Sequence, residues 1–374
     1  LIPDWMRQPT LGYQPTKDPE GWGLKKQEIL LHEGVNVINV KKAGNVYVDY
    51  FADDPDTAPA VTIHFVTGKV NGYFDATVQS NEDWNRLLDN AVSPVMDVKG
   101  KYIQLAYPVE QLKKLTYGKG KELAENYDKV MQVQYDFSGA TKYNRIPKKR
   151  ILARVNFNYF MFRDGDGVAF EGTDGTMKAA IGPEVTTNWG IHHEIGHVMQ
   201  MRPWGGMTEV SNNLFSMYGT MSLGDSSRLS KRHIYEAAFS KVLNAPEKQF
   251  IMCVKDPFHK LIPFWQIQIY ADKIGYKDFY ADLMEHLRNQ PHKGAGNASI
   301  HNMYEYIKLC CDFLKTDLTD FFDAWGFFQT GKFHVGDYGN YDFEVTPKMI
   351  EETKHYIASK NYPKPSMDVT KLTD

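Results

Sequence analysis

Three residues that could hold and use a metal ion stand in the order H-E-x-x-H near the middle of the chain: His193, Glu194 and His197. Residues four apart on a helix share one face, with their β-carbons ~6 Å apart, so both imidazoles can reach one ion. Glu194 follows the first histidine, which places its carboxylate beside the ion. There it can take a proton from a water that zinc activates. The motif therefore predicts a zinc site suited to hydrolysis, with Glu194 as the catalytic base.

A catalytic zinc needs a third protein ligand and an open fourth position. We expect this ligand to be Glu209, which begins a second stretch with an apolar helical face. Asn213, four residues further on, lies on the same face and is expected to hydrogen-bond a ligand imidazole. His192 competes by adjacency, but on a helix it points ~100° away from His193. It is expected to be structural or to face the cleft.

The elements that must position these residues are mostly helical. Apolar residues recur at intervals of three and four beyond Asn188, and Thr346 followed by Pro347 is a good start for a last helix to Ser359. The other predicted helices span residues 192–201, 209–217, 231–243, 264–274, 278–287, 301–314 and 317–325.

The N-terminal third has a different pattern. Short runs rich in β-branched and aromatic residues, bounded by turn residues, occur at 35–40, 44–51, 61–66 and 101–106. A helical interval and a strand at 151–162 follow. We therefore predict an α+β protein with two domains. Residues 1–107 are expected to form a β-sandwich, and residues 108–374 a mostly helical zinc-site domain with a small sheet.

Composition excludes several classes of function. The 374 residues carry 43 Lys and Arg against 46 Asp and Glu, a net charge of −3, so nucleic acid is not an expected partner. No stretch of ~18 apolar residues could span a bilayer. The three cysteines, Cys253, Cys310 and Cys311, suggest neither a disulfide framework nor a zinc ribbon.

The run from Trp189 through His193, Glu194 and His197 to Asn213 resembles the active site of the enhancin-like gluzincin peptidases, metallopeptidase family sixty. Their signature is H-E-x-x-H followed within a few tens of residues by Glu, and eleven residues separate His197 from Glu209 here. Weaker similarities continue downstream, at residues 264–266, 325–326 and 346–359.

The resemblance implies cleavage of peptide bonds beside O-linked, mucin-type glycans, with the sugar itself recognised. It implies one catalytic Zn²⁺, a glycoprotein or mucin-like substrate, and secretion or attachment to a bacterial cell surface, with a signal or lipid anchor trimmed from the mature form. Under this reading the substrate-binding candidates are Arg202, Trp204, Asn212 and Tyr218.

Several alternatives remain open at this point. A general zinc peptidase without a glycan requirement, a carbohydrate-binding surface protein with an inactive zinc site, and a nonpeptidic metallohydrolase all fit the motif. A strand at 177–181 is expected to pair with substrate backbone. A donor for the oxyanion is also required. The candidates are Tyr218, His233, Tyr235, Tyr270 and Tyr304.

Overall fold

The structure, a computed structural model, describes residues 2–3, 6, 26–41, 44–54, 56–200 and 204–374. The chain forms two compact units, which are described separately. Unit 1 comprises Leu1–Lys129 and Lys149–Thr186, and unit 2 comprises Val130–Lys148 and Thr187–Asp374. No helix of the described residues is long and apolar enough to cross a membrane.

Unit 1 is built on a six-stranded mixed sheet in the order β3-β4-β5-β6-β8-β7. Its centre is parallel, with Ile103 of β5 opposite Ile151 of β6 and Ala153 of β6 opposite Val168 of β8. Strand β4 runs antiparallel to β5 and parallel to β3, and β7 runs antiparallel to β8. The strands are β3 (Phe74–Asp75), β4 (Val95–Lys99), β5 (Ile103–Pro108), β6 (Ile151–Asn156), β7 (Met161–Asp164) and β8 (Gly167–Glu171), with a separate pair β1 (Ile2–Pro3) and β2 (Lys26–Gln27).

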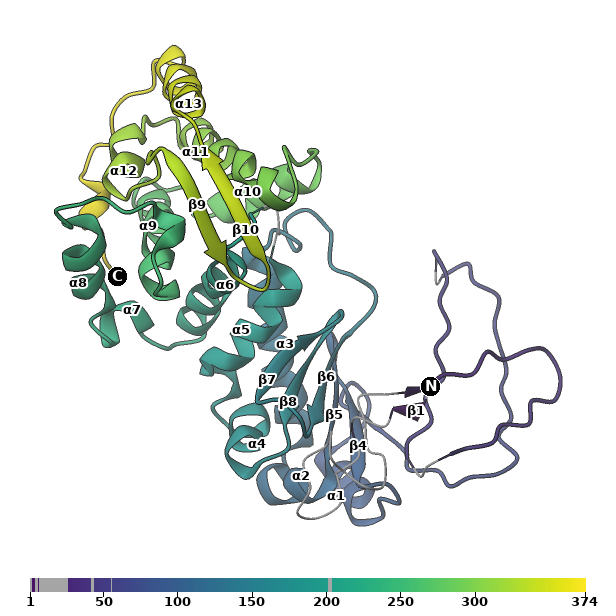
Figure 1. Ribbon diagram of the computed structural model, residues 1–374. Helices are drawn as coiled ribbons and strands as arrows, with labels where there is room; N and C mark the ends of the chain where they lie inside the picture. The colour runs from purple at the N-terminus through teal and green to yellow at the C-terminus, as the bar shows by residue number, and fades with distance from the viewer. Residues whose placement is uncertain (1, 4–5, 7–25, 42–43, 55, 201–203) are drawn as a thin grey trace. The chain divides into compact units, whose positions relative to one another are not determined.

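Helices α1 (Asn81–Asp89), α2 (Val109–Thr116) and α4 (Asp174–Ile181) pack together beside this sheet (Figure 1). Helix α3 (Gly120–Phe137) begins in unit 1 and ends in unit 2, and a short 3₁₀ turn, η2 (Val185–Thr187), precedes the main part of unit 2. The predicted strand at 177–181 is wrong, since this segment is the end of α4. The buried residues of α4 have helical spacing: Thr176, Met177, Ala180 and Ile181. The apolar run at 177–181 was too short to distinguish this spacing from that of a strand.

A β-sandwich over residues 1–107 is not confirmed. The described residues between 28 and 72 contain no strand, and the side chains of Val35 and Val37 are 96% and 95% exposed. Strands β4 and β5, which fall within the predicted domain, instead belong to the sheet that continues to β8. Alternating apolar residues indicate that a segment can form a strand, but a strand is stable only when another strand pairs with it.

Unit 2 is mostly helical, as predicted, with one antiparallel pair of strands. Asn340–Val345 (β10) pairs with Gly331–Gly336 (β9) along its whole length. Neither strand was predicted. The helices are α5 (Trp189–Met199), α6 (Thr208–Ser222), α7 (Arg228–Lys231), α8 (Ile234–Ala238), α9 (Pro257–Lys273), α10 (Phe279–Arg288), α11 (Ile300–Leu314), α12 (Thr319–Ala324) and α13 (Pro347–Ser359), with shorter turns η3 (Phe239–Leu243), η4 (Ile251–Cys253), η5 (Gly296–Ser299) and η6 (Val369–Lys371).

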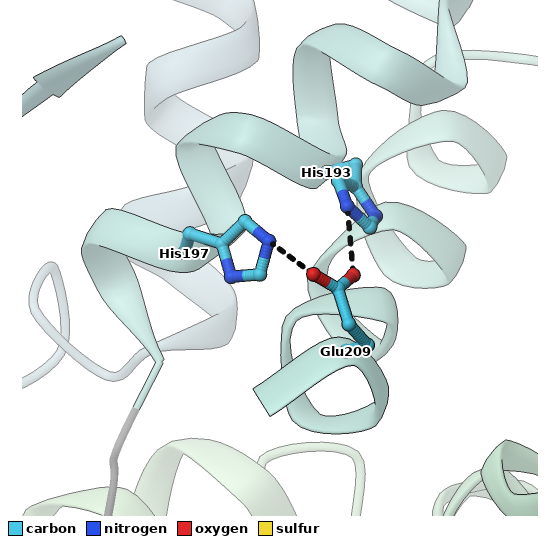
Figure 2. A group of neighbouring side chains, drawn as sticks. All are labelled: His193, His197 and Glu209. Atoms are coloured by element: carbon cyan, nitrogen blue, oxygen red, sulfur yellow. Dashed lines mark ion pairs between the residues drawn. The ribbon is translucent and has the colours of Figure 1, made fainter. Parts of the chain in front are cut away.

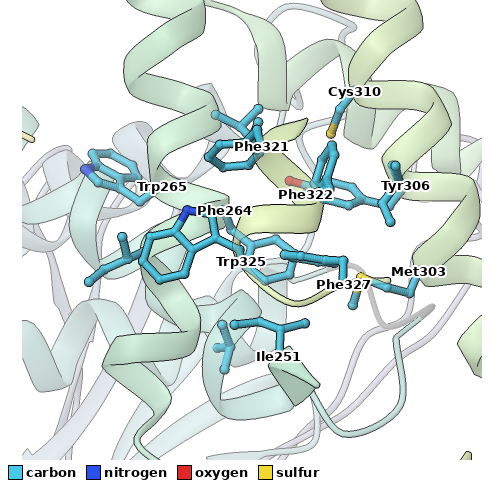
Figure 3. Close-up of a cluster of buried hydrophobic side chains, with 14 of the residues drawn as sticks. Ile251, Phe264, Trp265, Met303, Tyr306, Cys310, Phe321, Phe322, Trp325 and Phe327 are labelled. Atoms are coloured by element: carbon cyan, nitrogen blue, oxygen red, sulfur yellow. The ribbon is translucent and has the colours of Figure 1, made fainter. Parts of the chain in front are cut away.

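Two downstream segments that carried the family resemblance meet in the core of unit 2 (Figure 3). The indole of Trp325 is fully buried and donates to Oε1 of Gln266 at 2.9 Å. Phe264 packs beside Phe327 in the same cluster, with ring centroids 5.8 Å apart. This core fixes α9 and α11, and α9 in turn contacts α6. The aromatic residues in these segments therefore support the helix that carries Glu209.

Candidate metal centre

Helices α5 and α6 pack closely because Gly196 of α5 lies against the backbone of α6. A β-carbon added at Gly196 would lie only 2.7 Å from the backbone oxygen of Asn212, a distance that no side chain tolerates. Helix α5 begins at its Asn188 cap, whose Oδ1 accepts a hydrogen bond from the Ile191 amide at 3.3 Å. This packing aligns the histidines of α5 with the first turn of α6.

The structure brings His193, His197 and Glu209 together, with their imidazoles and carboxylate directed at a common point (Figure 2). Nε2 of His193 lies 3.1 Å from Oε2 of Glu209, and Nε2 of His197 lies 3.5 Å from Oε1. Tetrahedral zinc with bonds of ~2.1 Å separates its ligand atoms by about 3.4 Å. Two nitrogens and one carboxylate are also the ligand set that zinc prefers, so these residues fit the ion.

The ionisable groups of His193 and Glu209 affect each other's pKa values. Burial opposes ionisation of Glu209, but hydrogen bonds with His193 and His197 outweigh it and hold the pKa of Glu209 well below its usual range. Burial likewise opposes protonation of His193, yet its bonds to Glu209 and Asn213 raise its pKa. The carboxylate is therefore ionised at neutral pH and attracts a positive charge, as a metal ligand must.

Glu194 is buried beside these residues but belongs to neither ion pair. Its side chain lies on α5 between the two histidines and is 7% exposed. Burial raises the pKa of Glu194, against the lowering effect of the positive charges that His193 and His197 carry when protonated. A desolvated carboxylate with a raised pKa is a stronger base than one in water, which suits proton transfer.

Hydrogen bonds orient both ligand imidazoles. Oδ1 of Asn213 lies 2.8 Å from Nδ1 of His193, and the Asn213 amide also donates to the backbone oxygen of Glu209 at 2.7 Å. The carboxamide of Gln200 contacts Nδ1 of His197 at 2.9 Å and accepts from the Ser211 hydroxyl at 2.6 Å. In His193, Nδ1 donates to the Asn213 oxygen, which leaves Nε2 for the metal.

We expect Asn213→Ala to weaken metal binding about 10- to 100-fold, because His193 loses the acceptor that fixes its orientation. Competition with a chromophoric chelator measures this affinity. Asn213→Asp, which keeps an acceptor oxygen at the same position, is the matched control and should stay within a few fold of the unaltered chain. Equal affinity in Asn213→Ala would show that this hydrogen bond does not orient the ligand.

His192 faces away from the metal ligands. It is fully buried, and its Nδ1 lies 2.7 Å from the amide nitrogen of Gln134 on α3. A β-carbon at Gly219 of α6 would collide with its ring, so the histidine fills the space that this glycine leaves. Its role is structural, one of the two that the sequence allowed.

The candidate sugar-binding residues have different environments. Asn212 is fully buried, with its amide nitrogen 2.9 Å from Nε2 of His197, and Trp204 is 8% exposed and packs edge-on against Tyr306. The ring of Tyr218 is half-buried and stacks on Phe137 at 4.7 Å. Arg202 lies outside the described residues. Asn212 and Trp204 therefore contribute to the packing around the ligands, and sugar contacts by any of the four stay a prediction.

The site also contains a tyrosine that the sequence analysis missed. Tyr338 lies at the turn between β9 and β10, with its ring perpendicular to that of His197 and centroids 6.1 Å apart. Its hydroxyl is near enough to Glu209 for the carboxylate to act on its ionisation. Loss of hydration at this end of the side chain, together with the negative charge of Glu209, raises the pKa of Tyr338 to about 12, although the residue as a whole is 84% exposed.

The backbone around Tyr338 holds it in this position. Its φ of 50° lies in the left-handed region, which is unusual for a bulky residue and typical of functional turns. The neighbouring Asp337 accepts a hydrogen bond from the Thr208 amide at the start of α6. The N-cap residue of this helix makes no side-chain capping bond, so Asp337 caps the helix in its place. The turn is thereby joined to the helix that carries Glu209.

The earlier tyrosine and histidine candidates for the oxyanion donor have other partners. Tyr235 bonds Asp374, Tyr270 bonds Thr316, Tyr304 bonds the backbone of Phe327, Tyr218 stacks on Phe137, and His233 lies 3.5 Å from Glu236. The ring contact with His197 distinguishes Tyr338 from all of them.

Two histidines and a glutamate converge beside a buried glutamate, and this group could hold a metal ion. The chain belongs to the peptidase M60 family, enhancin and enhancin-like, whose model matches residues 69–326. The enhancin-like resemblance is therefore confirmed, and homologues in this family are metallopeptidases. No curated protein sequence matches the chain.

Solved structures share the fold at low sequence identity. A metallopeptidase from Bacteroides thetaiotaomicron is 23% identical with a TM-score of 0.68, over 82% of this chain and 53% of its own. A metallopeptidase in complex with Tn antigen is 24% identical with a TM-score of 0.70, over 83% and 59%. The M60 catalytic domain of Clostridium perfringens ZmpC, in complex with the sialyl T antigen, is 18% identical with a TM-score of 0.59, over 80% and 57%. The chain thus spans between half and three fifths of these proteins.

Proposed function

We propose that this chain is a zinc-dependent endopeptidase that cleaves proteins beside O-linked, mucin-type glycans. The observation that carries the proposal is the convergence of His193, His197 and Glu209 on one point, next to the buried Glu194. Membership of the M60 family supports peptide hydrolysis. Two structural neighbours hold glycan antigens, which supports a glycosylated substrate. Since such substrates are extracellular, the proposal includes secretion or display on a bacterial cell surface.

In the proposed reaction His193, His197 and Glu209 hold the ion, and Glu194 moves the proton. When bound, zinc supplies Lewis-acid chemistry that polarises the scissile carbonyl and makes water more acidic. Glu194 accepts a proton from the attacking water as the new carbon–oxygen bond forms. It then gives this proton to the amide nitrogen as the carbon–nitrogen bond breaks. Burial of Glu194 keeps bulk water from competing for the proton.

Tyr338 is the proposed donor to the oxyanion. It lies at the turn between β9 and β10, with its ring against that of His197 and its hydroxyl under the influence of the Glu209 carboxylate. Charge develops on the carbonyl oxygen in the transition state, and a donor aimed at that charge is stronger in a partly desolvated site than in water. With its pKa raised to about 12, the phenol stays protonated across the neutral range and is able to donate.

A pair of identical peptides, one with an O-linked N-acetylgalactosamine on Ser or Thr and one bare, tests the glycan requirement. We expect the wild-type chain to cleave the glycosylated form and leave the bare form intact in a mass-spectrometric assay. Cleavage of both forms at similar rates would keep the peptidase and remove the sugar requirement. That outcome would favour a general peptidase, which the burial of Asn212 and Trp204 also permits.

A further inference from the structure

Arg228, for which no ion pair is present among the described residues, packs against Trp189, one helical turn before the ligand His193. The guanidinium carbon of Arg228 is 4.7 Å from the ring centroid of Trp189 and 5.1 Å from that of Phe258. These two rings also contact each other, with centroids 5.7 Å apart. We call Trp189, Arg228 and Phe258 the arginine stack. All three side chains are half-buried.

The electrostatic surroundings of Arg228 differ from those of the arginines that pair with a carboxylate. Arg145, Arg154 and Arg288 each form an ion pair with a carboxylate. For Arg228, by contrast, no ion pair is present within the described part of the chain, and its Nε is buried without a hydrogen-bond partner there. Burial, and then the positive charge of Arg232, lower the pKa of Arg228. Two positive groups thus lie near each other, and no ion pair among the described residues balances the charge of Arg228.

The arginine stack is close to the metal centre because of where Trp189 lies. Trp189, His193 and His197 follow one another at intervals of four residues on α5, so they share a face of this helix. Four residues advance a helix by about 6 Å. Trp189 is also the first residue of α5, where the positive end of the helix dipole adds to the charge of Arg228.

We propose that Arg228 binds a carboxylate of the substrate, and that the arginine stack is an acidic-group subsite adjacent to the metal centre. This inference rests on the proposed function in taking the bound anion to be part of the substrate. The guanidinium of Arg228 packs against both aromatic rings, which restricts its orientation, and a planar fork of N–H donors matches the two oxygens of a carboxylate. These ring contacts restrict the side chain before binding, which favours affinity.

The carboxylate has two possible sources, an acidic sugar on the glycan or an Asp or Glu of the peptide. Four fluorescent glycopeptides separate them. They share one sequence and differ in whether the glycan carries sialic acid and in whether Glu or Gln flanks the glycosylated residue. Their dissociation constants are measured by anisotropy with the full chain carrying Glu194→Gln, so that no cleavage interferes with binding.

We expect one acidic form to bind on the order of tenfold more tightly than its neutral counterpart, which is typical of a hydrogen-bonded charge pair. Arg228→Gln should remove this preference, and Arg228→Lys should keep only part of it. Arg232→Gln, which removes the same charge from an exposed neighbour, is the matched control and should keep the preference within about twofold. Thermal melting of each variant reports its stability.

Arg228→Met keeps an unbranched stem against the two rings. It replaces Arg228→Gln if that variant melts below the assay temperature. Equal binding of all four probes, or an acid preference that survives both Arg228→Gln and Arg228→Met, would overturn the inference. Cleavage of the neutral glycopeptide by the unaltered chain is measured in parallel. It reports on the proposed function alone, so a failed subsite and a failed peptidase give different results.

Discussion

Glu194→Gln should lower the rate of peptide cleavage by about 10²- to 10⁴-fold while leaving the metal content unchanged. The amide has the shape of the carboxylate but cannot accept the proton of the attacking water. Residue 194 takes no part in the contacts of Glu209 with His193 and His197, so the substitution leaves the three metal ligands in place. Single-turnover cleavage of a glycopeptide, with zinc determined by mass spectrometry on the same sample, measures both quantities.

The matched control for this variant is Glu247→Gln, which makes the same chemical change at an exposed site. It should keep full activity. If Glu194→Gln retained activity within a few fold of the unaltered chain, the assignment of Glu194 as the base would be wrong. Loss of zinc together with activity would instead place Glu194 among the groups that hold the ion.

Tyr338→Phe should reduce kcat by about 10²-fold with little change in KM or in metal affinity. The substitution removes one hydroxyl and keeps the ring that lies perpendicular to His197. A donor that acts on the developing oxyanion contributes to the transition state more than to the bound substrate, so its loss affects kcat. Steady-state kinetics on the glycopeptide and a chelator competition measure the three quantities.

Tyr159→Phe, at an exposed tyrosine of unit 1, controls for the loss of a phenol hydroxyl in general. A second comparison uses a phosphinic peptide that mimics the tetrahedral transition state. Tyr338→Phe should weaken its inhibition by roughly the same factor as kcat. A rise in KM alone, with kcat unchanged, would mean that Tyr338 contacts the substrate without stabilising the transition state.

The H-E-x-x-H helix and Glu209 could be predicted from the sequence because helical periodicity shows which nearby residues share a face. His193 and His197 share one face at a spacing of four, and the next apolar-faced helix starts at Thr208, one residue before Glu209. Asn213, predicted to contact a ligand imidazole, lies 2.8 Å from Nδ1 of His193 in the structure. The position of these residues depends on local geometry and one helix–helix contact.

Tyr338 was not predicted because its place in the site depends on tertiary structure. It reaches His197 from a hairpin far along the chain, and no helical or strand period connects the two. A signal was present: alternating residues on both sides of the turn sequence Asp337, Tyr338 and Gly339 indicate a hairpin. An aromatic residue between turn-forming residues would then have been a candidate for a functional position.

The N-terminal segment shows the opposite failure, in which a clear local pattern did not determine the structure. Val46, Val48 and Tyr50 alternate as strand residues do, yet all three are exposed and none lies in a strand. Pairing requires a second strand in register, and sequence alternation does not supply one. The run 177–181 was misread for a related reason, since a short apolar segment fits either period until its neighbours are known.

The most direct test of the account is the metal itself. The purified chain is analysed for bound metals and then stripped with a chelator. Cleavage of the glycopeptide is assayed before stripping, after stripping and after addition of zinc. A variant that carries His193→Ala, His197→Ala and Glu209→Ala is treated in the same way. We predict one zinc ion per unaltered chain, loss of cleavage on stripping and recovery on zinc addition, with neither bound zinc nor activity in the variant. Cleavage that persists in the stripped chain, or a full equivalent of zinc in the variant, would contradict the account.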